Sequence, residues 1–258
     1  MPLILIAVFL FTAALYASVG FGGGSTYNAV LAMAGADYRV IPTIALVCNI
    51  IVVSGGVWRF SSTRDLNLRR LTPFLIASVP AAWVGGRLPI SETLFIGLLG
   101  GALMISGLHM VFQTPGKEFE TSPPPPPTDN LLVATVAGGL IGLLSGLVGI
   151  GGGIFLAPVL YWMQWGRPHQ IAAACSLFIL VNSISGLSGQ LTKLQDLSLL
   201  SLAAPYWPLP LTVLLGGQIG SWLASYKFSP SVIRKMTAIL ILYVAIRLIV
   251  RWFGMIFS

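Results

Sequence analysis

Two glycine clusters of the same form are the residues of this chain whose types and spacing could do chemistry. The first runs from Gly20 to Gly24 as Gly-Phe-Gly-Gly-Gly, and the second from Gly149 to Gly153 as Gly-Ile-Gly-Gly-Gly. Each cluster interrupts an apolar segment, so we expect the glycines to turn the chain and to expose backbone N–H groups at the start of a short helix. Such a helix start attracts anions. Two of them facing each other would form an anion pocket without a buried cation.

Polar residues near the two turns are the candidate ligands of that anion, because hydroxyl and amide groups donate hydrogen bonds to an oxyanion in a dry site. Asn49 and Asn182 are favoured, since an unpaired amide at membrane depth is costly. Each side chain could equally bond its own backbone or a neighbouring helix. A Cβ at Gly23 or Gly152 is expected to block a positive φ and the approach of backbone to ligand. The predicted substrate-binding residues are Gly22, Gly23, Gly24, Ser25, Thr26, Asn28, Asn49, Gly151, Gly152, Gly153, Ser176 and Asn182.

Other reaction chemistries have no counterpart in the sequence. It contains no obvious nucleophile–base pair, no metal-ligating cluster and no phosphate loop of the GxxxxGK[ST] type. We therefore expect no enzyme, no metal, no cofactor and no ATP-driven pump. Cys48 and Cys175 lie in apolar segments and are expected to be small buried side chains. The net charge of +7 comes mostly from short loops and does not indicate a nucleic-acid partner.

The composition is that of a membrane protein. Hydrophobic residues make up 56% of the chain and charged residues only 8%, against about 25% charged residues in a soluble domain. Most of the apolar segments approach the roughly 20 residues that cross a bilayer as a helix. Two segments, 25–35 and 154–164, are too short to do so. The ten segments are 2–19, 25–35, 39–58, 71–88, 92–112, 131–148, 154–164, 169–190, 198–225 and 231–252.

These segments form two copies of one unit. Gly149 follows Gly20 by 129 residues (149 − 20), and beyond the clusters an offset of 131 (185 − 54) pairs Ser54-Gly55 with Ser185-Gly186. Between the copies, five consecutive prolines, 123–127, predict an extended, water-exposed connector. We divide the chain into a first transmembrane repeat (1–112), a polyproline linker (113–130) and a second transmembrane repeat (131–258).

Basic residues in the loops decide how the segments cross. If 2–19 and 25–35 form a hairpin that returns to its starting side, nine basic residues share one side of the membrane with the linker. They are Arg59, Arg64, Arg69, Arg70, Lys117, Arg167, Lys227, Arg234 and Lys235. Four lie on the other side, namely Arg39, Arg87, Lys193 and Arg251. A single crossing would split them seven to six, so only the hairpin satisfies the cytoplasmic excess of Lys and Arg.

The hairpin also gives each copy an odd number of crossings, which orients the copies oppositely. The expected fold is an all-α polytopic membrane protein of two inverted five-segment repeats, with short broken or re-entrant helices at the GxGGG motifs. Both termini then face outward and the linker is cytoplasmic.

The two glycine clusters, opening short helices in duplicated modules, resemble the TauE/SafE family of sulfite exporters. The run from Gly146 to Pro158, Gly-Leu-Val-Gly-Ile-Gly-Gly-Gly-Ile-Phe-Leu-Ala-Pro, is especially typical, and the resemblance covers nearly the whole chain apart from the linker. It implies movement of sulfite, sulfoacetate or other sulfur-containing or organic anions across a bacterial inner membrane. The first copy departs from the pattern with Ser25-Thr26-Tyr27-Asn28, which biases polar contacts toward that half.

The expected function is that of a secondary transporter. It would export small sulfur-containing oxyanions such as sulfite, sulfoacetate or related organosulfonates, held near mid-membrane by the short-helix N-termini. The alternatives are an importer of sulfate-, thiosulfate- or carboxylate-type anions and a non-transporting membrane scaffold subunit. Expected partners are the oxyanion and membrane lipid, with a homodimer as a candidate assembly.

Overall fold

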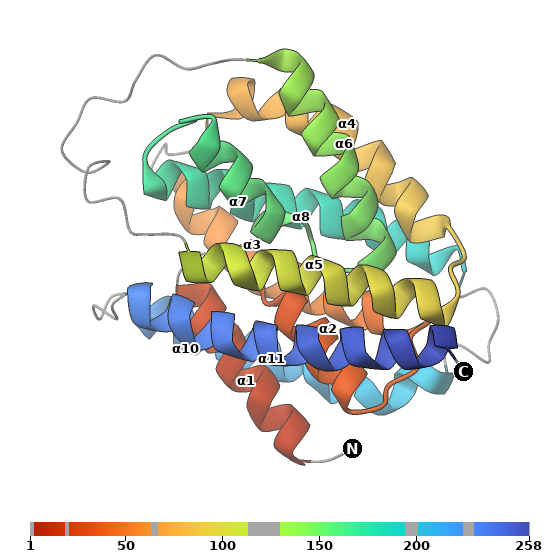
Figure 1. Cartoon of the computed structure of the whole chain (residues 1–258). Helices are drawn as coiled ribbons and strands as arrows, with labels where there is room; N and C mark the ends of the chain where they lie inside the picture. Colours follow the sequence, from red (N-terminus) through yellow and green to blue (C-terminus); the bar gives the residue numbers. More distant parts are fainter. Residues whose placement is uncertain are drawn as a thin grey trace.

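The computed structural model describes residues 3–18, 21–62, 67–112, 130–193, 201–223 and 230–257, which are helices and short connections with no strand among them (Figure 1). Nearly all of the linker and the basic residues Arg64, Lys117 and Lys227 lie outside these ranges. The helices of the first half are α1 (Leu3–Ser18), α2 (Gly24–Met33), α3 (Ile41–Ser62), α4 (Leu68–Arg87) and α5 (Glu92–Phe112). Those of the second half are α6 (Leu131–Val148), α7 (Gly153–Trp162), α8 (Pro168–Leu191), the short 3₁₀ turn η2 (Ala204–Tyr206), α10 (Pro208–Leu223) and α11 (Pro230–Phe257).

Four of the described helices are long and apolar enough to cross a bilayer. They include stretches of α3 (Ile41–Trp58), α5 (Glu92–His109), α6 (Leu131–Val148) and α8 (His169–Leu191). Helices α1 and α7 are apolar but shorter. Large apolar side chains remain exposed along α1, α5, α6 and α11, which suits helices whose outer surface faces lipid rather than water. The all-helical, multi-pass character expected from the composition is thus confirmed.

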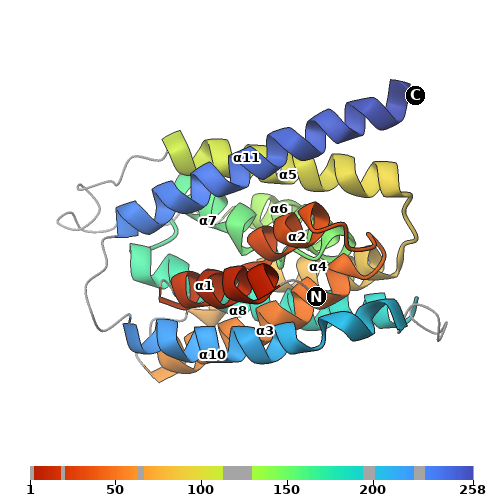
Figure 2. The ribbon, with the colours of Figure 1, turned by 90° about the horizontal axis from the view of Figure 1, so that it is seen from below.

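Helices from the two halves are interleaved. In Figures 1 and 2, α5 and α11 run side by side, and α1 lies along α10. Helix α4 of the first half packs closely on α6 and α8 of the second, and α3 packs on α8. The first segment of each half therefore contacts the fourth segment of the other, while the third and fifth segments contact their own counterparts.

The fourth segment of the second half differs from expectation. The sequence predicts one apolar segment over 198–225, whereas the described part begins with a helical turn and η2 and continues as α10 from Pro208. Pro205, Pro208 and Pro210 explain the interruption, since proline removes a backbone donor and clashes with the preceding turn. Local backbone chemistry here overrides the apolar pattern.

Glycines let α4 and α6 touch through their backbones. A Cβ on Gly138 would lie 2.5 Å from the carbonyl oxygen of Phe74, and Gly142 and Gly146 face the carbonyl oxygens of Ser78 and Ala82. These three glycines occupy every fourth position of α6 and form the packing stripe that their spacing predicts.

Gly97 and Gly101 of α5 have the same spacing and predict a similar packing contact, but this prediction is only half right. Gly97 faces the indole of Trp252 on α11, and a Cβ added to Gly97 would lie 2.6 Å from Nε1 of that indole. Gly101, one turn further on, would meet nothing within 4 Å. The spacing of the two glycines alone could not distinguish them. Cys48 and Cys175 are both buried and unpaired, as expected.

Replacing Gly146 by leucine should destabilise the fold. The new side chain would meet the Ala82 carbonyl and, at 2.7 Å from its Cβ, the backbone nitrogen of Gly86, and backbone atoms cannot move aside cheaply. We expect a loss of about 1–3 kcal/mol or more in the free energy of unfolding, measured by thermal unfolding in detergent. Gly101→Leu in α5 is the matched control and should unfold like the wild type. Equal stability of both variants would contradict the close α4–α6 contact.

Candidate functional site

The two glycine clusters meet at the side chain of Asn49. This residue lies about half-way along the apolar stretch of α3, and its Nδ2 donates a hydrogen bond of 3.2 Å to the carbonyl oxygen of Ile150. A Cβ on Gly22 would lie 2.7 Å from Asn49 Oδ1, and one on Gly151 would lie 2.8 Å from Asn49 Nδ2. A Cβ on Gly24 would lie 2.5 Å from the Ile150 oxygen. We call Gly22–Gly24, Ile150–Gly153 and Asn49 the glycine crossing.

Both short helices begin at the glycine crossing without a side-chain cap. The N-cap residues are Gly23 for α2 and Gly152 for α7, and neither helix has a side-chain hydrogen bond at its cap. The earliest helical bonds are donated by the backbone of Tyr27 to Gly23 O (2.8 Å) and by that of Phe155 to Gly152 O (3.1 Å). The N–H groups before them have no acceptor in their own helix. Two partially positive helix ends are therefore held near one buried amide.

The glycine backbone differs between the two turns. Gly149, Gly151 and Gly152 have φ of 80°, 85° and 81°, a region that other residues rarely adopt. Gly23 has φ of −91°, so the expected positive φ is wrong there and correct at Gly152. Gly23 instead provides room for the ring of Tyr27, whose Cζ would lie 2.6 Å from an added Cβ.

The predicted polar ligands are buried but only some reach the crossing. Thr26 lies 3.0 Å from the hydroxyl of Tyr16 on α1. Ser176 donates to Ala172 O (2.9 Å), and Asn182 Nδ2 to Phe178 O (2.8 Å), both within α8. Ser25 and Asn28 are buried in α2. Among the predicted polar side chains, Asn49 is the one whose contacts reach both glycine turns.

One residue at the crossing was missed by sequence reasoning. Ser183 of α8 is fully buried, its hydroxyl has no hydrogen-bond partner, and it lies 3.2 Å from a Cβ built on Gly151. It directly follows Asn182, and the two residues point about 100° apart around the helix. Helix α8 is apolar around most of its circumference. Its sequence pattern therefore does not indicate whether Asn182 or Ser183 points toward the turn.

The crossing is polar but uncharged. None of its residues titrates in the neutral range, and no group of three or more His, Cys, Asp or Glu in the described ranges could hold a metal ion. Gly23, Gly24 and all of 149–153 are buried, with Gly22 half-buried. The positive potential available to an anion here comes from oriented backbone N–H groups and amide or hydroxyl dipoles.

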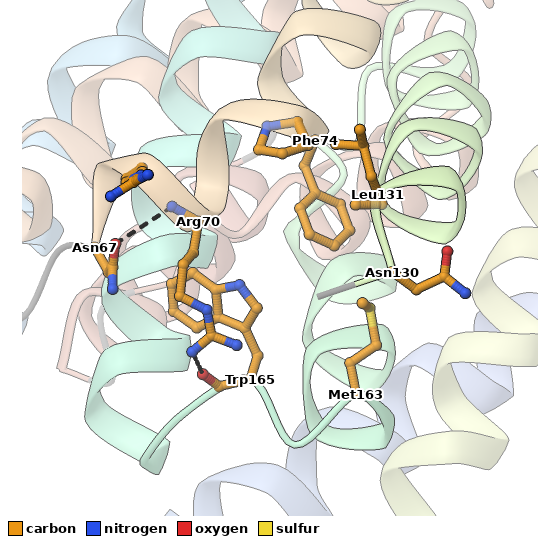
Figure 3. Close-up of a pocket in the computed structure, with 10 residues that line it drawn as sticks. Asn67, Arg70, Phe74, Asn130, Leu131, Met163 and Trp165 are labelled. Atoms are coloured by element: carbon orange, nitrogen blue, oxygen red, sulfur yellow. Dashed lines mark hydrogen bonds between the residues drawn. The ribbon is translucent and has the colours of Figure 1, made fainter. Parts of the chain in front are cut away.

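A pocket of about 450 Å³ lies at the end of the molecule where the linker enters α6 (Figure 3). We call it the linker-end pocket. The guanidinium of Arg70 donates to the carbonyl oxygen of Trp165 (2.6 Å) and lies 5.2 Å from the centre of its indole ring. This contact ties the start of α4 to the segment after α7. The residues that line the pocket are Asn67, Arg69, Arg70, Pro73, Phe74, Asn130, Leu131, Ala134, Met163 and Trp165.

A second pocket, of about 230 Å³, lies at the other ends of α4, α6 and α8. We call it the Lys193 pocket. It is lined by Tyr38, Arg39, Pro42, Pro89, Ile90, Phe95, Leu147, Gln190 and Lys193. Neither pocket is lined by a glycine of the crossing.

Comparison with known proteins identifies the family of this chain. The family described as Sulfite exporter TauE/SafE matches residues 5–248, a range that contains both glycine clusters. A probable membrane transporter protein, y4hK of Sinorhizobium fredii (strain NBRC 101917 / NGR234), is 33% identical over 247 residues, covering 95% of this chain and 97% of that protein. No solved structure matches the chain. The chain therefore belongs to the TauE/SafE family of sulfite exporters and is a membrane transporter of that family.

Proposed function

We propose that the protein is a secondary transporter that exports small sulfur-containing oxyanions, sulfite or an organosulfonate, across the bacterial inner membrane. The observation that carries the proposal is the meeting of two uncapped helix N-termini at Asn49. An oxyanion held there would accept hydrogen bonds from backbone N–H groups. The second N–H of the Asn49 amide and the Ser183 hydroxyl are further donors.

An uncharged site suits an anion that must leave again. A buried Lys or Arg would hold an oxyanion tightly and would itself be costly at membrane depth, whereas dipoles attract it more weakly. Moving one negative charge out of a cell with a potential of 100 mV releases about 2.3 kcal/mol, and a dianion about twice that. Export by this route needs no energy source within the chain.

The two halves are proposed to be inverted repeats. The pairing of first with fourth, third with third and fifth with fifth segments is the pattern that a two-fold axis produces. Corresponding connections also lie at opposite ends. Asn67, between α3 and α4, lines the linker-end pocket, whereas Lys193, just after α8, lines the other pocket. An axis across the helices, in the membrane plane, relates these positions.

Helices α6 and α7 are proposed to form a re-entrant hairpin. Asn130, just before α6, and Met163, just after α7, line the same linker-end pocket, while Leu147 near the end of α6 lines the Lys193 pocket. The chain thus turns back at Gly149–Gly152, where its backbone is enclosed by protein, as a break within a bilayer requires. Arg69 and Arg70 lie at the linker end, and they belong to the nine basic residues counted on the side of the linker against four on the other side, so the positive-inside rule favours a cytoplasmic linker end.

Flux into proteoliposomes tests the proposed function directly. Protein reconstituted with an inside-positive or inside-negative potential should carry sulfite and sulfoacetate at rates that follow the potential. A chain that inserts and remains folded, yet carries no anion under either potential, would be a scaffold rather than a transporter. Sulfate, thiosulfate and acetate provide the comparison that defines selectivity.

Single cysteines should report opposite sides for equivalent connections. In whole cells, a membrane-impermeant maleimide should label Lys193→Cys and not Asn67→Cys, because these positions follow the equivalent helices α8 and α3 and line opposite pockets. The native Cys48 and Cys175 are buried and provide a low background. Labelling of both engineered residues from the same side would rule out the inverted arrangement.

Adding a methyl group to Gly151 should impair transport more than adding one to Gly152. Both residues have positive φ, so Gly→Ala strains each backbone similarly, by about 1–2 kcal/mol. At Gly151 the methyl group points at Asn49 and Ser183, and at Gly152 it points at the apolar side chains of Phe178 and Ile141. We expect at least about tenfold lower flux for Gly151→Ala at comparable thermal stability. Equal flux in the two variants would indicate that the turns serve only packing.

Asn49→Leu should weaken anion affinity more than Asn182→Leu does. The Asn49 amide touches both turns, whereas the Asn182 amide already donates within its own helix. A lost bond to a charged group costs about 1.5–3 kcal/mol, or about 10- to 100-fold in the dissociation constant. Competitive flux with sulfoacetate, on variants of similar melting temperature, provides the measurement. A larger loss for Asn182→Leu would move the site along α8, away from Asn49.

A further inference from the structure

The Lys193 pocket contains an ammonium group held in place by a buried amide. Lys193 Nζ donates to Gln190 Oε1 (3.2 Å), and Gln190 Nε2 donates to Gly146 O on α6 (2.8 Å). Gln190 is only 2% exposed, so its orientation is fixed between α6 and α8. The lysine is half-buried, and it lines a pocket whose lining includes no carboxylate.

Lys193 carries the net positive charge of this pocket. The second basic residue, Arg39, forms two hydrogen bonds with the carboxylate of Asp37, from Nε to Oδ1 (2.9 Å) and from Nη2 to Oδ2 (2.6 Å). That guanidinium holds the pKa of Asp37 below its usual value, so the pair stays ionised and its charges cancel. An anion that enters the pocket is therefore attracted chiefly by the ammonium of Lys193.

The pocket adjoins the second glycine turn. Pro42 lines the pocket and also packs on Gly149, whose added Cβ would lie 2.5 Å from Pro42 Cα. Leu147, two residues before Gly149, lines the pocket as well. The wall of the pocket is thus the start of the turn that leads to the glycine crossing.

We propose that the Lys193 pocket is a second anion site, at which a small sulfonate or sulfite ion binds the ammonium of Lys193 on its way between the glycine crossing and the side of the membrane opposite the linker. This inference rests on the proposed transport function and adds a site outside the crossing. Its role is to raise the local anion concentration at one mouth, as charges in a cleft do for a diffusing ion.

The charge of Lys193 should vary with pH in the physiological range. Burial lowers the pKa of this lysine to about 8, so the ammonium is charged in neutral solution and loses its charge as the pH rises above that value. The other charged or titratable groups of the described ranges at this end are Asp37, Tyr38, Arg39, Arg87, Glu92, Tyr206 and Arg251.

The first test is the KM for sulfoacetate presented separately from each side of oriented proteoliposomes. Sulfoacetate is used because it stays fully ionised near neutral pH, unlike sulfite. Lys193→Gln should raise KM by about two- to fivefold from the Lys193 side, and leave KM from the linker side unchanged. The wild-type KM should rise between about pH 7 and about pH 9, and Lys193→Arg should abolish that rise. Arg251→Gln, which removes one positive charge at the same end, is the matched control because Arg251 pairs with Glu92 outside the pocket.

The second test does not depend on flux. Acylation of the Lys193 amine, followed by peptide mass spectrometry, should slow in the presence of sulfoacetate and not in the presence of a neutral glycol. If Lys193→Gln leaves KM unchanged from both sides of the membrane, and sulfoacetate does not slow acylation of Lys193 in the wild type, the second site is overturned while the transport function remains intact. If sulfoacetate protects Lys193 in a protein that carries no anion across the membrane, the anion site is supported and the transport function is overturned.

Discussion

The hydrogen bond from Asn49 to the Ile150 carbonyl is the interaction on which the rest of the structure depends. A membrane interior offers no water to a broken helix, so every freed backbone group must find a partner in protein. Here a side chain from the first half satisfies a carbonyl in the second, and the glycines on both sides leave the space in which the amide fits. A bulkier residue at Gly22, Gly24 or Gly151 would occupy the position of that amide.

Close backbone approach follows from the same constraint. The turn at Gly149 can sit beside α3 because α6, which leads into it, lies directly on α4 through Gly138, Gly142 and Gly146. Gln190 reaches across from α8 to the Gly146 carbonyl, so the helix that carries the glycine stripe is tied on a second face. Small residues therefore fix the distance between helices, and that distance determines whether the two turns meet.

Charge is distributed in a complementary way along the helices. The middle of the described structure holds amides, hydroxyls and backbone dipoles at Asn49 and Ser183, while arginine and lysine lie at the two ends, in the linker-end pocket and the Lys193 pocket. Ions at the ends remain partly hydrated and inexpensive, whereas an ion in the middle would need full compensation. For the proposed anion transporter, this arrangement would attract the substrate at each mouth and hold it weakly between them.

The sequence by itself determined the all-helical membrane character, the segment over 131–148 that α6 matches residue for residue, and the pairing of glycine clusters, because composition, run length and repetition are local properties of the chain. The apolar run 198–225 breaks at its prolines, a local effect that the apolar pattern alone does not reveal. The sequence also failed where several helices compete for the same space. Gly23 keeps an ordinary φ where Gly152 does not, and Ser183 rather than Asn182 has the free polar group beside Gly151. A helix that is apolar nearly all round carries no pattern that fixes its rotation. Only the packing of α8 against α3, α4 and α6 decided which of its polar side chains faces the crossing.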